Sequence, residues 1–117
     1  MQSRDWRLRL EDMLEAIGRI ARYTAGMDWG RFAADDKTID AVVRNLEIIG
    51  EAARHTPEEV TRQHPEIPWE KMRGIRNLLA HEYFGVDVNI VWLTVTTELP
   101  ALAPLMRAIL DRTGDDA

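Results

Sequence analysis

The sequence predicts an all-α protein, folded as an antiparallel bundle of four to five helices, four of them main elements. Three observations lead to this fold class. Apolar residues recur at steps of three and four along most of the chain, as they do on one face of an α-helix. Only 5 Pro and 7 Gly punctuate the 117 residues, and most of them fall between these stretches. The 45% of hydrophobic residues can form one small core. We therefore expect a single domain over residues 1–112, followed by a short acidic tail, residues 113–117.

The first two helices have the clearest apolar faces. One helix is predicted from Trp6 and should end near Gly26. After a loop that contains residues 28–30, Asp35 or Asp36 can cap the second helix. The apolar face of the first comprises Leu10, Met13, Leu14, Ile17, Ile20 and Ala21, and that of the second comprises Ile39, Val42, Val43, Leu46, Ile49 and Ala53.

Proline residues mark the start of the next two helices. Thr56 followed by Pro57 is a typical helix start, and a short helix should run from there toward His64. Pro68 opens a further helix, on which Met72, Ile75 and Leu79 have helical spacing. We expect that helix to continue through Arg76 to about His81 or Tyr83.

The last predicted helix begins at Asp87, which can cap it, and extends to about Ile109. Pro100 and Pro104 should kink or split this helix. Residues 86–97 are rich in β-branched side chains, so a strand is a local alternative there. We reject it because a lone strand would have no partner in a chain that otherwise has helical spacing.

Composition excludes several classes of function. The formal charge is −5, so the whole molecule lacks the basic field of a protein that coats nucleic acid. No Cys is present, which excludes disulfides and cysteine zinc sites, and no glycine-rich phosphate-binding loop occurs. The N-terminus lacks an apolar signal core, and no apolar run approaches the roughly 20 residues of a membrane span. We expect a cytoplasmic protein with no membrane contact.

Four side chains suited to RNA chemistry lie close together in the sequence: Arg76, Asn77, His81 and Tyr83. Histidine titrates near neutral pH and can exchange a proton with a ribose 2′-hydroxyl or a leaving 5′-oxygen. Arginine is permanently charged and can stabilise the phosphorane-like transition state, and the amide of Asn77 can orient either partner. Such a reaction needs no metal or cofactor. A structural alternative is a polar helix face or a dimer ion-pair set with Glu82.

One helix does not easily bring these groups together. Arg76 and Tyr83 are seven residues apart and share a helix face, whereas His81 points well around the cylinder. A two-fold dimer would place the arginines and histidines of both protomers along one shared cleft. The local charge is modest, because residues 69–83 carry a net +1 before His81 is counted.

A second constellation, Glu47, Glu51 and His55, occupies one face of the second predicted helix. Carboxylate bundles bind metals, but a di-metal site needs matching ligands from a facing helix, and the sequence offers none. A solvated or interface-facing edge is the favoured interpretation, and we assign no metal site.

The segment R-N-L-L-A-H-E-Y, residues 76–83, resembles the R-x4-H-x-Y motif of the HEPN superfamily, specifically the HepT-like toxins. The resemblance extends over most of the chain, with no departure at a motif position; in this family a polar residue directly follows the arginine, as Asn77 does here. Further matching segments are residues 12–17, 23–24, 41–53, 67–69 and 91–100.

The resemblance implies an all-α, HEPN-like homodimer that cleaves RNA without a metal, with Arg76 and His81 as catalytic residues and Asn77 beside them. It also implies a toxin of a type VII-like toxin–antitoxin system, paired with an MntA-like nucleotidyltransferase antitoxin. That antitoxin would silence the toxin by transferring AMP from ATP to Tyr83. An alternative is a HEPN dimer without turnover, serving only as a binding platform for the nucleotidyltransferase.

Overall fold

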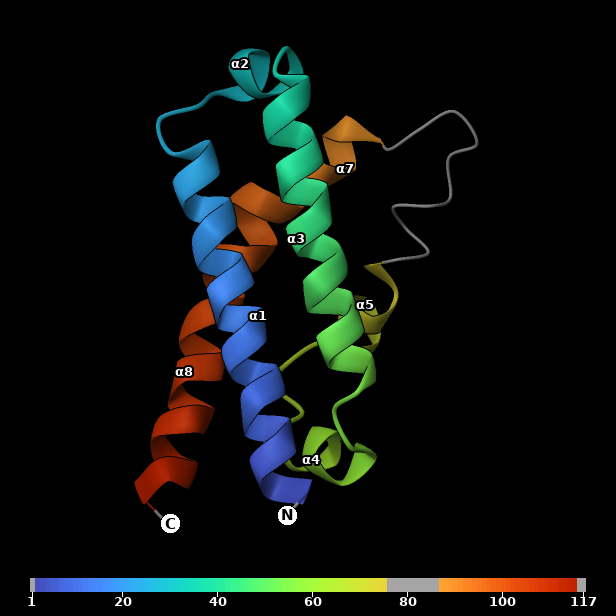
Figure 1. The fold of residues 1–117 in the computed structure, drawn as a ribbon, viewed down its shortest axis with the longest axis vertical. Coiled ribbons are helices and arrows are strands. Elements are labelled where there is room, and N and C mark those ends of the chain that lie inside the picture. Colours follow the sequence, from blue (N-terminus) through green and yellow to red (C-terminus); the bar gives the residue numbers. More distant parts are fainter. Residues whose placement is uncertain (1, 76–86, 116–117) are drawn as a thin grey trace.

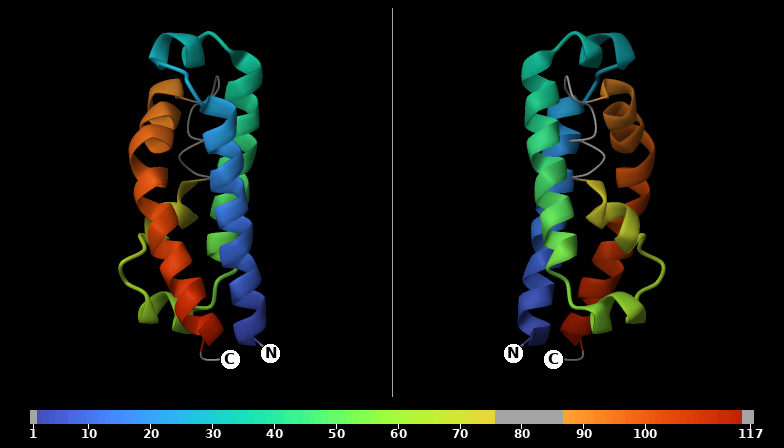
Figure 2. Two further views of the ribbon diagram at one scale, coloured as in Figure 1. Left: turned by 90° about the vertical axis from the view of Figure 1, so that its left-hand side faces the viewer. Right: turned by 90° about the vertical axis from the view of Figure 1, so that its right-hand side faces the viewer.

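A computed structural model describes residues 2–75 and 87–115, and all the regular secondary structure within them is helical. Two long helices, α1 (Gln2–Thr24) and α3 (Asp36–Arg54), run antiparallel to each other (Figure 1). The third long rod is antiparallel to α1 and consists of α7 (Val88–Leu93), η1 (Thr94–Glu98) and α8 (Leu99–Asp115). Figure 2 shows α1 and α3 as one layer and the third rod as a second layer. The all-α prediction is confirmed.

Helix α1 ends, and helix α3 begins, close to where the sequence predicts. Helix α1 ends at Thr24, and Gly26 adopts a φ of 76°, a left-handed conformation that glycine accepts without strain. Helix α3 is capped by Asp35, whose carboxylate accepts from the backbone N–H of Thr38 at 3.0 Å and from its hydroxyl at 2.8 Å. The backbone hydrogen bond from Thr38 is the main cause that lowers the pKa of Asp35 below its ordinary value of 3.8.

The predicted loop around residues 28–30 contains a short helix, α2 (Trp29–Ala33), and this corrects the sequence analysis. The Asp28 carboxylate caps α2 by accepting from the backbone N–H of Arg31 at 2.9 Å. Phe32 on α2 is fully buried and lies 4.8 Å, between ring centroids, from Trp92. A helix of five residues is too short to show a helical repeat in the sequence.

The short helix after Pro57 is confirmed as α4 (Glu58–Gln63). The start pattern predicts Thr56 as its N-cap, and this is wrong. Thr56 is buried, and its hydroxyl donates to the carbonyl of Ala52 at 3.0 Å. Thr56 therefore stabilises the end of α3, while Pro57 occupies the N-cap position of α4 without a side-chain hydrogen bond.

The third rod is one continuous helical run with a π-helical insert, so the rejection of a strand at residues 88–97 is confirmed. Asp87 caps α7 as predicted, accepting from the backbone N–H groups of Asn89 at 3.0 Å and Ile90 at 3.4 Å. Pro100 has no N–H to donate to the carbonyl four residues earlier, which lies in η1, and the helix widens there. At its other end α8 continues to Asp115, three residues into the predicted tail.

Within the described ranges, the run Val88–Arg112 has 25 residues and is long and apolar enough to cross a membrane by length and composition alone. The sequence has no uninterrupted apolar run of that length, and polar residues interspersed along the helix hid this segment from the sequence analysis. In the structure the run contributes Val91, Val95, Leu99, Met106 and Ile109 to a core shared with α1 and α3. Packing within the protein thus accounts for part of its apolar character, since 28% of the most apolar stretch is buried.

The core lies mainly between α1 and α3 and against the third rod. One buried polar side chain crosses the first of these interfaces. The Asn45 amide donates to the carbonyl of Ala41 at 2.9 Å and accepts from the guanidinium of Arg19 on α1 at 3.4 Å. These bonds satisfy a buried amide that would otherwise destabilise the core.

Candidate active site

The four residues singled out by the sequence, Arg76, Asn77, His81 and Tyr83, lie outside the described residues. The structure describes the chain on either side, which is Ile75 before them and Asp87, the cap of α7, after them. The helix α5 (Trp69–Arg73) leads toward the Arg76 motif, and we call the segment Trp69–Ile75 the stem. Its attachment to the rest of the fold sets where the chain enters the motif.

Helix α5 begins beside Pro68, as the sequence predicts, but ends before the predicted end at His81 or Tyr83. Helix α5 ends at Arg73, and the C-cap residue Gly74 donates its backbone N–H to the carbonyl of Glu70 at 3.0 Å and also to that of Met72. The helical repeat that joined Met72 to Leu79 in the sequence is therefore interrupted by a turn at Gly74. The part of that helix beyond Ile75 lies outside the described residues.

The stem is attached to the fold by its apolar side chains and one buried hydrogen bond. Trp69, Met72 and Ile75 are each less than a tenth exposed. The indole N–H of Trp69 donates to the carbonyl of His64 at 2.9 Å, which ties α5 to the end of α4. The stem is thus a buried and hydrogen-bonded part of the molecule.

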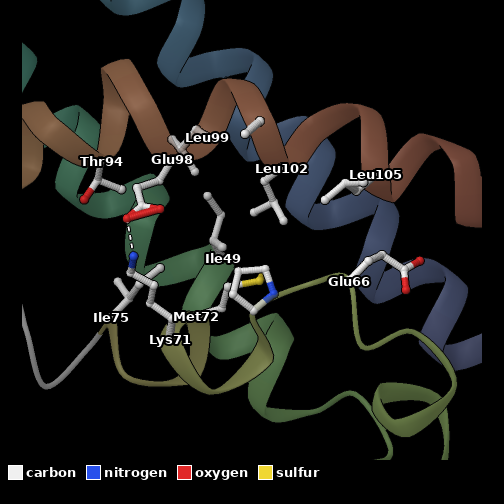
Figure 3. A pocket seen from close by; sticks show the side chains of 12 residues that line it. Ile49, Glu66, Lys71, Met72, Ile75, Thr94, Glu98, Leu99, Leu102 and Leu105 are labelled. Atoms are coloured by element: carbon white, nitrogen blue, oxygen red, sulfur yellow. Dashed lines mark hydrogen bonds and ion pairs between the residues drawn. The ribbon is translucent and has the colours of Figure 1, made fainter.

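A cavity of about 310 Å³ lies beside the stem, between α3, α5 and the third rod (Figure 3). Its wall is mainly apolar, with Ile49 from α3, Met72 and Ile75 from the stem and Leu102 from α8. At its rim Lys71 forms an ion pair with Glu98 of η1. Volume and lining suit apolar side chains better than a phosphate.

The Lys71–Glu98 pair changes the charge balance that the sequence suggested. Lys71 contributes to the net +1 of residues 69–83, but its charge is compensated by a carboxylate 27 residues away in sequence. The sequence analysis missed Glu98 because no local pattern relates η1 to α5. Both side chains are solvent-accessible, at 66% and 37%, so the pair contributes little to stability.

The alternative metal constellation lies on an exposed face of α3. Glu51 and His55 form a pair at 3.5 Å, from carboxylate oxygen to Nδ1, and both side chains are about half exposed. Glu47 and Glu51 line a hollow together with Arg9, Asp12 and Arg44. Carboxylates and guanidinium groups are therefore both present in it. Across residues 2–75 and 87–115, no three His, Asp or Glu side chains are grouped to hold a metal ion.

Comparison with known proteins places the chain in a family. The model of the HepT-like family, described as "Ribonuclease HepT-like", matches residues 13–109, which span most of α1, all of α3, the stem, the Arg76 motif and much of α8. The chain belongs to the HepT-like ribonuclease family. The family resemblance drawn from the R-x4-H-x-Y segment is thereby confirmed.

Individual relatives of this HepT-like protein agree with the family match. It is 48% identical over 93 residues to "Probable ribonuclease HepT" of Thermococcus cleftensis, which covers 80% of this chain and 84% of the relative. A protein of Methanocaldococcus jannaschii, which carries a provisional RNase name, is 37% identical over 117 residues, covering 99% of this chain and 97% of the relative. No solved structure matches the chain significantly.

Proposed function

We propose that this HepT-like protein is a metal-independent endoribonuclease in which Arg76 binds the scissile phosphate and His81 exchanges protons. The observation that carries the proposal is the segment R-N-L-L-A-H-E-Y, which follows the stem directly and lies within the family match. Asn77 follows the arginine and orients the RNA or its catalytic partner. No metal ligand set is needed for this chemistry.

The proposed reaction is an internal transesterification. A base removes the proton of the ribose 2′-hydroxyl, and the 2′-oxygen forms a bond to the adjacent phosphorus. The bond from phosphorus to the 5′-oxygen breaks, and that oxygen takes up a proton. The products are a 2′,3′-cyclic phosphate and a 5′-hydroxyl, while the Arg76 guanidinium stabilises the charge that builds on the phosphoryl oxygens.

RNA would bind locally and in a salt-sensitive manner. The chain carries a formal charge of −5, and the Lys71 ammonium of the stem is already paired with Glu98. The net positive charge beside the motif is therefore small, which suits an enzyme that releases its products more than a protein that coats RNA.

The finer role we propose is that of a cytoplasmic toxin whose catalytic cleft is formed by a homodimer. Its partner would be a nucleotidyltransferase antitoxin that transfers AMP from ATP to the Tyr83 hydroxyl, with release of pyrophosphate. The added bulk and negative charge would repel the RNA phosphate and silence the enzyme. Intact mass measured after incubation with the antitoxin and ATP tests this, because one adenylyl group should appear on the wild type and not on Tyr83→Phe.

Ribonuclease activity itself is tested with purified, unmodified protein and a mixed RNA pool in EDTA. We expect cleavage that persists in EDTA, leaves cyclic phosphate ends and falls by at least about 100-fold in His81→Ala, the usual contribution of a positioned acid–base group. His55→Ala is the matched control, because His55 lies on the exposed face of α3 and should leave the rate unchanged.

Absence of cleavage by a folded wild type whose Tyr83 is unmodified would contradict the enzyme proposal. It would favour the alternative of a binding platform for the nucleotidyltransferase. In that case His81→Ala should weaken assembly with the partner rather than catalysis.

A further inference from the structure

Gly50 is a buried glycine in the middle of α3, at the point where α3 meets the stem. A Cβ built on Gly50 would lie 3.2 Å from the carbonyl oxygen of Met72 and 3.4 Å from the Cβ of Ile75. The first distance is tighter than ordinary van der Waals contact, and the second lies at its lower limit. A side chain at position 50 would therefore require the Met72 carbonyl of the stem to move away by a few tenths of an ångström.

Gly18, the glycine in the middle of α1, is different. A Cβ on Gly18 would meet only the flexible end of Arg22, at 3.7 Å. Glycine in a helix interior is unfavourable compared with alanine. At Gly50 the close approach of the stem accounts for the missing side chain, whereas packing does not account for it at Gly18.

The contact at Gly50 involves the atoms that set the direction of the chain toward Arg76. The Met72 carbonyl, which a Cβ would push, is also an acceptor for the backbone N–H of Gly74, the C-cap of α5. Ile75, the other contact, is bonded directly to Arg76. A displacement of Met72 and Ile75 away from α3 would therefore move the point from which the chain continues into Arg76.

We propose that Gly50 is a positioning residue of the ribonuclease, because its missing side chain seats the stem against α3 and thereby sets the position of Arg76. This inference rests on the proposed function, in which Arg76 binds the scissile phosphate. Gly50 itself touches no substrate. It acts through Met72 and Ile75. Its substitution should therefore change the rate of the chemical step more than the affinity for RNA.

The test compares Gly50→Ala with Gly18→Ala as the matched control. We expect Gly50→Ala to lower kcat by about tenfold or more with a smaller change in KM. The reason is that misplacement of a catalytic group by an ångström or less slows the chemical step. Gly18→Ala should retain wild-type kcat. Assays run well below the melting temperature of each variant, with and without a stabilising osmolyte, because the osmolyte restores a loss caused by partial unfolding and does not restore one caused by misplacement.

Two further comparisons separate positioning from a structural role. In an Arg76→Ala background, Gly50→Ala should reduce the residual rate by less than about twofold, because the residue through which it acts is already gone. A full additional loss in that background overturns the inference. Retention of wild-type kcat by Gly50→Ala overturns it as well.

A second pair of variants probes the same contact if Gly50→Ala does not fold. Ile75 and Ile39 are equally buried, each 8% exposed, but only Ile75 contacts Gly50. Ile75→Ala should lower kcat, while Ile39→Ala should cost comparable stability and leave kcat unchanged. Equal kcat in the two variants overturns the inference.

The wild type, assayed in parallel, separates the two proposals. Absence of cleavage by the wild type overturns the proposed function and this inference with it, whereas wild-type cleavage without an effect at Gly50 overturns the inference alone.

Discussion

Asp35 shows how one side chain makes the start of a long helix sensitive to pH. Its carboxylate accepts two hydrogen bonds from Thr38, and the first cause of its lowered pKa is the backbone bond. Because the pKa is lower in the folded than in the unfolded protein, ionised Asp35 stabilises the fold above the ordinary pKa of 3.8. That contribution is lost as the pH falls through the lowered value.

We therefore expect Asp35→Asn to melt at a lower temperature than the wild type at neutral pH and to approach it at acid pH. Asparagine still caps a helix but carries no charge, so the variant removes the pH-dependent part of the interaction. Thermal unfolding followed by circular dichroism at a series of pH values checks this, with Asp36→Asn as the neighbouring control. A constant difference in melting temperature across the series would contradict the assignment.

Predictions at single residues succeeded where the interaction is local. Asp35 and Asp87 cap their helices through backbone N–H groups two or three residues ahead, so the sequence pattern contains both partners. Thr56 was assigned wrongly because its hydroxyl donates to a carbonyl at the end of α3, that of Ala52, and does not accept from a backbone N–H of α4. Glu98 was missed because its partner Lys71 is distant in the sequence.

At the scale of elements, α5 depends on its tryptophan for attachment to the fold. Trp69 is 5% exposed and donates its indole N–H to the carbonyl of His64. We expect Trp69→Phe to lower the free energy of unfolding by about 1–3 kcal/mol, because it leaves a void and removes the indole hydrogen bond to the carbonyl of His64. Denaturant unfolding measures the change.

Trp29→Phe is the control for this prediction, because Trp29 on α2 is 41% exposed and offers little packing to lose. Its free energy of unfolding should stay within about 0.5 kcal/mol of the wild type. Equal effects of the two substitutions would show that α5 is not held mainly by Trp69.

The long helices were predictable and the short ones were less so, for physical reasons. Helices α1 and α3 each bury a stripe of apolar residues many turns long, which produces a clear repeat in the sequence. Helix α2 is a single short turn that buries Phe32 alone. Helix α5 ends at Arg73, where Gly74 forms the C-cap, although helical spacing in the sequence continues beyond it.

At the scale of the whole molecule, the sequence points to candidate site residues but not to their arrangement. Residue type and spacing single out Arg76 and His81, and the family match spans both positions. In the proposed dimer their arrangement would depend on packing between distant segments and between protomers, which no local pattern encodes. The close approach at Gly50 is of the same kind, since only the fold brings residue 50 against residues 72 and 75.

The shared cleft of the proposed dimer can be tested by complementation between two variants with strongly reduced cleavage rates, Arg76→Ala and His81→Ala. If each site takes its arginine from one protomer and its histidine from the other, a mixed dimer regains one intact site. After subunit exchange in an equal mixture, about half of the dimers are mixed, so about a quarter of the wild-type cleavage rate should return. Native mass spectrometry of differently tagged protomers confirms that exchange has occurred. Mixed dimers without activity would mean that each protomer carries a complete site, and a monomer in solution would contradict the dimer itself.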